Sequence, residues 1–274
     1  MSETNQNCSD YPGRNELIQL ISNILTHYNL MKNYLIILFY ALLFASCEST
    51  ETELTSTDAS HFNKKIQDLT PLNPANTFDY VGQVHFDISN YYFSDSNLPK
   101  TIDSIVSQVN MKASIHPFFD DFLSTDYNLV PQSRITYLVS DPQTAFDSIV
   151  NDLPLDNTAK NDFRLFVETV LSKVDNDVDY IDIHNYVVLY ESAIQDSSQL
   201  SASEKEYLLT VTSIIRHSVY AKKKRPKKNT DLDWYWLSAK FTGAVEGAQY
   251  GKSHAILTAL KAGIIENRLM YFSH

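Results

Sequence analysis

Apolar residues recur every three or four positions along most of the chain from His61 onward, which is the spacing of amphipathic α-helices. The helical pattern covers residues 78–93, 102–122 with a bend or break at Pro117, 142–153, 157–174, 180–197 and 202–220. No segment of four or more residues, bounded by turn residues, alternates cleanly between apolar and polar positions. The only strand candidates are residues 135–139 and 178–183. The pattern therefore predicts an all-α fold, an irregular multi-helix bundle.

Several helix starts carry capping signals. Asn76 or Thr77 can cap the helix over 78–93, and Asp141 precedes a proline at the first helical position. Ser201 and Glu204 form a capping box, in which each side chain accepts a hydrogen bond from the other residue's amide. The faces expected to be buried comprise Phe78, Val81, His85, Ile88 and Tyr92 in the first helix, Tyr186, Leu189, Tyr190 and Ile194 in the fifth, and Tyr207, Leu208, Val211, Ile214, Ile215 and Ser218 in the sixth.

Small residues stand at every fourth position near the C-terminus, at Ala239, Gly243, Gly247, Gly251, Ala255, Ala259 and Gly263. This stripe predicts one long C-terminal helix that packs closely against another helix. We favour packing within the same domain, with self-association and membrane insertion of a bacteriocin-like kind as alternatives. Charged residues interrupt the apolar face at Lys240, Glu246, Lys252 and Lys261, which counts against a spanning helix.

The segment from Met31 to Cys47 has a short start with one lysine, then ten apolar residues from Leu35 to Phe44, and small residues before the cysteine. It resembles a bacterial lipoprotein signal peptide, with Phe44 where leucine is most common. As a helix, ten residues span about 15 Å, half of a bilayer's roughly 30 Å core. The resemblance implies cleavage before Cys47 and acylation of Cys47, with a buried apolar helix as the alternative.

This interpretation divides the chain into segments. We expect residues 1–30 to be an over-extended N-terminus, 31–46 the signal peptide, 47–60 a flexible acidic tether, and 61–274 the helical domain with a basic linker at 221–230. The acidic tether resembles the surface-export signal of Bacteroidota lipoproteins. The predicted location is therefore the outer membrane, on its periplasmic or cell-surface side, with a lipid anchor.

Composition removes several classes of function. The formal charge of -11 disfavours binding of nucleic acid, and two cysteines and six glycines leave little for a disulfide framework, thiolate sites or phosphate loops. One local exception is a basic patch at Lys222, Lys223, Lys224, Arg225, Lys227 and Lys228. We interpret this basic patch as a solvated linker. The alternative is contact with anionic lipid or lipopolysaccharide, assisted by the aromatic residues 234–236.

Candidate chemistry is sparse. Residues 175–179 have the carboxylate spacing of a calcium loop, but Tyr180 and Tyr186 replace the required glycine and glutamate. His184 and His217, with Glu191 nearby, could bind a metal, although packing or hydrogen bonding is the favoured role of these histidines. We predict no catalytic residue, no metal site and no cofactor.

Two groups of residues resemble those of an uncharacterised group of Bacteroidota secreted proteins and lipoproteins. The matching residues are Asn73, Pro74, Tyr80, Gly82 and His85, and then Glu191, Ile194, Leu200, Ser201, Glu204, Lys205, Leu208, Leu209, Arg216, His217 and Ser218. A tryptophan followed by a tail rich in glycine and alanine completes the pattern, and the basic insert before Trp234 departs from it. The resemblance implies a family without a known activity.

The sequence therefore predicts a non-enzymatic protein that binds or scaffolds at the outer envelope. Its partners would be the membrane, through the N-terminal lipid, and an envelope protein or a second copy of the chain, but not nucleic acid. Two alternatives stay open: a membrane-active or immunity protein of the bacteriocin type, and a metal-dependent hydrolase.

Overall fold

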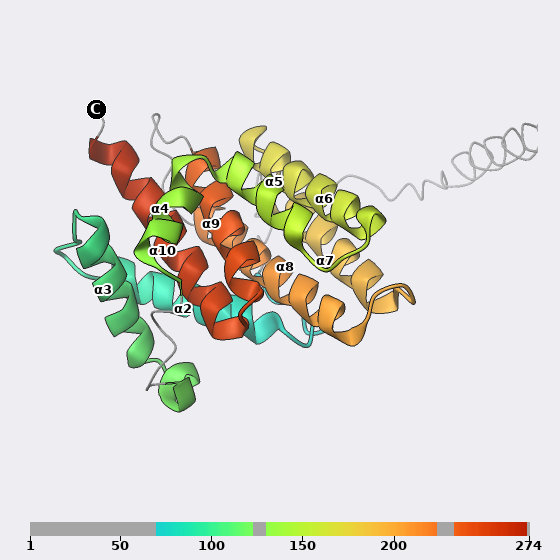
Figure 1. The fold of residues 1–274 in the computed structure, drawn as a ribbon, viewed down its shortest axis with the longest axis horizontal. Helices are drawn as coiled ribbons and strands as arrows, with labels where there is room; N and C mark the ends of the chain where they lie inside the picture. The colour runs from blue at the N-terminus through green and yellow to red at the C-terminus, as the bar shows by residue number, and fades with distance from the viewer. Residues whose placement is uncertain (1–69, 123–129, 224–232, 273–274) are drawn as a thin grey trace, which may run out of the picture. The chain divides into compact units, whose positions relative to one another are not determined.

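Side-chain caps hold several helix starts in the computed structural model, which describes residues 70–122, 130–223 and 233–272 (Figure 1). The predicted cap at Asn76 or Thr77 is not found, because the N-cap of that helix is Phe78, which makes no side-chain cap bond. These residues belong to one unit that extends over Lys65–His274. Oδ1 of Asp141 accepts a hydrogen bond of 3.1 Å from the amide of Thr144. The amide of Ser201 donates to Oε2 of Glu204 at 2.7 Å, and the amide of Glu204 donates to Oγ of Ser201 at 3.3 Å. The predicted capping box is thus confirmed.

The described residues form helices and no strands, so the predicted all-α class is confirmed. The helices are α2 (Asp79–Phe93), α3 (Ile102–Ser114), the 3-10 helix η1 (Pro117–Phe122), α4 (Gln132–Ser140), α5 (Pro142–Asp152), α6 (Asn157–Asp175), α7 (Tyr180–Asp196), α8 (Ala202–Lys223), α9 (Asp233–Ala248) and α10 (Lys252–Phe272). The strand candidates lie in α4 and at the start of α7. The predicted break at Pro117 separates α3 from η1.

The C-terminal segment corrects one prediction, because it forms a hairpin of two helices rather than one long helix. The chain turns between α9 and α10, where Gly251 has φ of +112°. Only glycine adopts this conformation without strain. Gly251 therefore belongs to the stripe in the sequence, but in the structure it lies in the turn between the two helices. The two helices lie side by side at the centre of the bundle (Figure 1).

The α9–α10 hairpin forms the middle of the core. Residues 237–247 of α9 and 253–265 of α10 are buried without interruption. Helices α4, α5, α6 and α8 pack on α9, whereas α2, α3, α4 and α8 pack on α10. A helix enclosed on all sides lacks the polar face of a surface helix, and the remaining helices supply the exposed surface of the unit.

The face that helix α7 presents to the core matches the predicted face only in part. Leu189 is 70% exposed, and the buried residues of α7 are Tyr180, Ile183, Val187, Glu191 and Ile194. The prediction is correct for Ile194, and Tyr186 and Tyr190 pack partly buried against the core, but Leu189 points outward and the enclosed Glu191 was not predicted. The inward face of α2 was predicted correctly, since Val81, His85, Ile88 and Tyr92 are all buried.

Candidate functional site

A buried polar cluster joins α2, α7 and α8, and we call it the Arg216 cluster. Its members are Asn73, Asn76, Asp79, Glu191, Arg216 and His217. Arg216 and Glu191 have side chains with no exposed surface. Charged side chains are almost never enclosed in this way unless they are paired, so the neighbouring groups must satisfy them.

Glu191 is held by three residues. Its Oε1 accepts from Nδ2 of Asn76 at 2.8 Å and from Nη2 of Arg216 at 3.3 Å. Its Oε2 accepts from Nδ2 of Asn73 at 2.6 Å and lies 3.2 Å from Nε of Arg216, close enough for an ion pair but without hydrogen-bond geometry. The loop before α2 is thereby attached to α7 and α8.

Asp79 is the second carboxylate of the cluster. Its Oδ1 accepts from Nη2 of Arg216 at 2.5 Å and from Nε2 of His217 at 3.2 Å. Burial raises the pKa of Asp79, but the hydrogen bond from His217 and the charge of Arg216 outweigh burial and leave this pKa below its usual value. Burial lowers the pKa of His217, so the neutral imidazole donates its Nε2 proton to Asp79.

Helix α2 approaches α8 closely at Gly82, which positions the cluster. The amide of Gly82 donates to Oγ of Ser213 at 3.1 Å. A Cβ atom at this position would lie 2.5 Å from the backbone oxygen of Ser213 and 2.5 Å from Cδ2 of His217. Glycine is therefore required for the two helices to meet at this distance.

His85 lies one turn after Gly82 and is 1% exposed. Neither ring nitrogen has a hydrogen-bond partner among the residues that the structure describes. Burial, followed by electrostatic interaction with Lys240 and His217, lowers the pKa of His85 well below its usual value. His85 is thus buried, as its place on the inward face predicts, but it packs there without a hydrogen bond to a described residue.

The structure brings together residues that the sequence resemblance singled out separately. Asn73, Gly82, Glu191, Arg216 and His217 all take part in the cluster or in the α2–α8 contact. Sequence reasoning missed Asp79, Asn76 as a ligand of Glu191, and Ser213. Asp79 could have been noted as an acidic residue in a first helical turn, but nothing in the sequence indicates its partner on α8.

The candidate metal ligands are not arranged around a common point. His217 contacts Asp79, and Glu191 contacts Arg216, whereas the ring of His184 lies beside that of Tyr180 with 5.8 Å between centroids. Within residues 70–122, 130–223 and 233–272, no group of three or more His, Cys, Asp or Glu side chains is placed to hold a metal ion.

The acidic residues 175–179 form the turn between α6 and α7. Asp177 has φ of 55°, the amide of Asp177 donates to the carbonyl of Val174 at 3.2 Å, and that of Val178 donates to Lys173 at 2.9 Å. These bonds define a Schellman motif, which satisfies the last carbonyls of a helix. The acidic segment therefore has a structural role, because it terminates α6.

The small-residue stripe packs inside the hairpin. Ala239, Ala255 and Ala259 have no exposed surface. A Cβ at Gly243 would lie 2.6 Å from the backbone oxygen of Thr258, and one at Gly247 would overlap the backbone oxygen of His254. A Cβ at Gly263 would lie 2.8 Å from Cε of Lys240, so three of the glycines allow close approach between α9 and α10.

The basic patch is described only in part. Lys222 and Lys223 belong to the last turn of α8, so the predicted linker at 221–230 begins later than expected. Nζ of Lys222 donates to the carbonyl of Val174 at 3.4 Å. Cations in a last helical turn complement the helix dipole. Lys224, Arg225, Lys227 and Lys228 lie outside the described residues, as do the side chains of residues 234–236.

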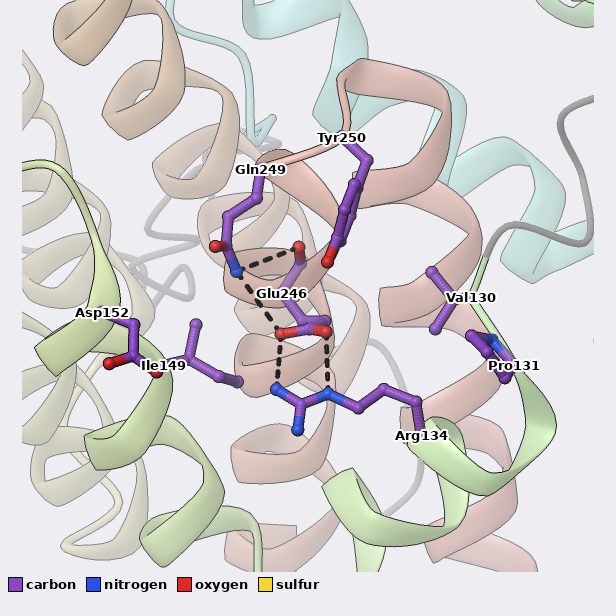
Figure 2. Close-up of a pocket in the computed structure, with 8 residues that line it drawn as sticks. All are labelled: Val130, Pro131, Arg134, Ile149, Asp152, Glu246, Gln249 and Tyr250. Carbon is purple, nitrogen blue, oxygen red and sulfur yellow. Dashed lines mark hydrogen bonds and ion pairs between the residues drawn. The ribbon is translucent and has the colours of Figure 1, made fainter.

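A surface pocket of about 360 Å³ opens between α4, α5 and the end of α9 (Figure 2). Its floor is an ion pair in which Nε and Nη2 of Arg134 donate to Glu246 at 2.8 and 2.9 Å. The hydrogen bond with Glu246 raises the pKa of Arg134. The guanidinium carbon also lies 4.7 Å from the ring centroid of Tyr137. Glu246 therefore holds one edge of the Arg134 guanidinium, and the Tyr137 ring packs on its flat face.

Several predicted features lie outside the described residues, namely the N-terminal segment 1–30, the signal peptide 31–46, Cys47 and the tether 47–60. Among the helices that the structure describes, none is both long and apolar enough to cross a bilayer. Comparisons with family models, curated proteins and solved structures found no match to this chain.

Proposed function

We propose that this chain is an exported, lipid-anchored helical protein that works without catalysis, by binding or scaffolding at the outer envelope. The observation that carries the proposal is the segment Met31–Cys47, with its lysine, ten apolar residues and cysteine. Acylation of Cys47 would hold the helical domain at the membrane through the acidic tether. The resemblance to a group of Bacteroidota lipoproteins supports the same location.

The helical domain supports a binding role through the distribution of its polar groups. The Arg216 cluster is enclosed, and its carboxylates are occupied by Asn73, Asn76, Arg216 and His217. A cluster of this kind fixes helices relative to one another and presents no group to a substrate. The pocket over Arg134, by contrast, places polar groups at the surface, where a ligand can reach them.

The experiment is mass spectrometry of the N-terminus of protein purified from membranes, combined with cell fractionation. We expect the chain to begin at Cys47 with the mass of two or three acyl groups, and to sediment with the outer membrane. The matched control is Cys47→Ala, which should abolish the acyl mass and processing at this site. Soluble, unmodified protein that begins at Met1 would contradict the proposal.

The bacteriocin-type alternative depends on the small-residue stripe being free to meet a membrane. In the fold, Gly243 and Gly247 pack against the backbone of α10, and the hairpin lies at the centre of the core. Insertion would require the surrounding helices to leave the hairpin and would bring buried Lys240 and Lys261 into lipid. These costs make a membrane-active role the weaker proposal.

A further inference from the structure

The pocket over Arg134 combines a fixed donor with open acceptors. Nη1 of Arg134 makes no hydrogen bond to any described residue, while Nε and Nη2 are held by Glu246. The Asp152 carboxylate, on the opposite wall at the end of α5, has no bonding partner within the described residues. Nε2 of Gln249 faces Glu246, which leaves Oε1 of Gln249 without a bond in the same part of the chain (Figure 2).

Apolar and aromatic surfaces complete the walls. Tyr250, in the turn between α9 and α10, is 59% exposed, and its side chain borders the pocket. Val130 and Pro131 line one side, and Ile149 lines the other (Figure 2). The volume of about 360 Å³ lies at the lower end of the range for small-molecule sites, about 300–1,000 Å³. The pocket therefore fits one or two small rings.

The charge of the lining narrows the chemistry of the ligand. The lining contains one cation, Arg134, and two carboxylates, Glu246 and Asp152, and the whole chain carries -11. The excess of negative charge, in the lining and in the whole chain, repels an anionic ligand. A cationic ligand attracted by Asp152 would lie in the same pocket as the positively charged guanidinium of Arg134, which repels it. A neutral ligand avoids both penalties.

We propose that this pocket binds a neutral saccharide unit. A sugar hydroxyl both donates and accepts, so hydroxyls on opposite edges of one ring can accept from Nη1 of Arg134 and donate to Asp152 on the other wall. The apolar C–H face of the ring can pack on the exposed ring of Tyr250. This inference deepens the proposed function, on which it rests for the idea that the anchored domain is a binding module.

The test uses saturation-transfer difference NMR on the full chain with glucose, galactose, mannose, N-acetylglucosamine and the disaccharides maltose and cellobiose. We expect transfer to the ring protons of at least one sugar, with a dissociation constant on the order of 1 mM for so small a ligand. Tyr250→Ala should weaken binding by roughly tenfold, because it removes the aromatic surface.

Two further variants and a control separate the causes of any loss. Arg134→Lys keeps the charge but loses the planar fork, and should weaken binding in the same way. The control Leu189→Ala removes another exposed apolar side chain, on α7 far from the pocket lining, and should leave binding unchanged. Unchanged circular dichroism would establish that each variant is folded.

The inference would be overturned if no sugar shows transfer at about ten times the expected dissociation constant. It would also be overturned if sugar binding survives both Tyr250→Ala and Arg134→Lys. A third contrary result is that the chain binds the amine putrescine and no sugar, and that Asp152→Asn abolishes the binding of putrescine. The measurement is independent of acylation. Failure of sugar binding therefore leaves the anchor at Cys47 untouched, and an unmodified Cys47 leaves sugar binding untouched.

Discussion

The bundle contains two arginine–glutamate pairs that differ in their access to water. Arg216 and Glu191 have no exposed side-chain surface, whereas the side chain of Arg134 is 37% exposed above a Glu246 that is 4% exposed. In the first pair, the side-chain amides of Asn73 and Asn76 also donate to Glu191, and Asp79 accepts a hydrogen bond from Arg216. In the second pair, Nη1 of the arginine faces an open pocket.

This difference shows how one pair of residue types serves two purposes. An enclosed pair is compensated only if every charge finds a partner, and then its removal is costly because the remaining charge stays buried. A pair at the surface keeps part of its hydration and contributes less to stability, and its unused donor is open to solvent, whereas the unused Nε and Nη1 of Arg216 are buried. Enclosure by α2, α7 and α8 thus makes Arg216 structural, and the hollow between α4, α5 and α9 leaves Arg134 available for binding.

The largest effect expected is from the removal of the enclosed arginine. Arg216→Met should lower the free energy of unfolding by about 3–5 kcal/mol, because Glu191 and Asp79 lose their buried counterion. Arg134→Met should cost less, about 1–2 kcal/mol, because it leaves the nearly buried Glu246 without its counterion but water in the open pocket can partly replace the guanidinium. Urea denaturation followed by circular dichroism measures both changes.

A double variant sharpens this comparison. Glu191→Gln in the Arg216→Met background removes the uncompensated charge and should recover part of the lost stability, since an amide oxygen still accepts from an asparagine. Equal costs for Arg216→Met and Arg134→Met would show that enclosure does not distinguish the two pairs.

An intermediate effect is expected from Gly82→Ala, which forces α2 away from α8 at the enclosed pair. The added methyl group would overlap the Ser213 carbonyl and the His217 ring, so we expect a loss of about 1–3 kcal/mol. Ser213→Ala removes only the hydroxyl that accepts from the Gly82 amide and should cost about 1 kcal/mol. Thermal unfolding of the two variants separates crowding from the lost bond, and full stability of Gly82→Ala would disprove the close-contact argument.

The smallest effect is a dependence of stability on mild acid. Folding lowers the pKa of His85 and His217, so below about pH 6.5 the unfolded chain binds more protons than the native one. Stability should therefore fall as the pH decreases, by about 1 kcal/mol between pH 7 and pH 6 for two imidazoles that stay neutral when folded. Asp79, whose pKa is also lowered, adds a loss only as the pH falls below about 4.

The control for this effect is His85→Leu, which removes the imidazole that lacks partners. Denaturation at pH 7 and pH 6 should show about half of the original acid sensitivity in this variant. If the variant and the natural chain lose the same stability over this range, another group is responsible. The open pair at Arg134 should not contribute to this dependence, because a guanidinium stays charged throughout.

The sequence was sufficient to predict the helices whose ends carry local signals. Asp141, Pro142, Ser201 and Glu204 act on amides within one turn of themselves, so their effect does not depend on the rest of the fold. The prediction failed at Gly251 and Leu189. Spacing alone does not reveal whether a glycine sits within a helix or ends it, and the three- and four-residue spacing that includes Leu189 does not show that Leu189 is exposed while Glu191 is buried.

The amino-acid sequence by itself determined the all-α class, the helix starts and the closely packed C-terminal residues, because helix formation and capping are local. Only the tertiary structure decided which charges are enclosed. Asp79 and Arg216 are separated by 137 positions, as are Arg134 and Glu246 by 112, and nothing in either neighbourhood marks the partner. Burial and pairing belong to the assembled helices, and they determine which arginine is enclosed in the fold and which lines a surface pocket.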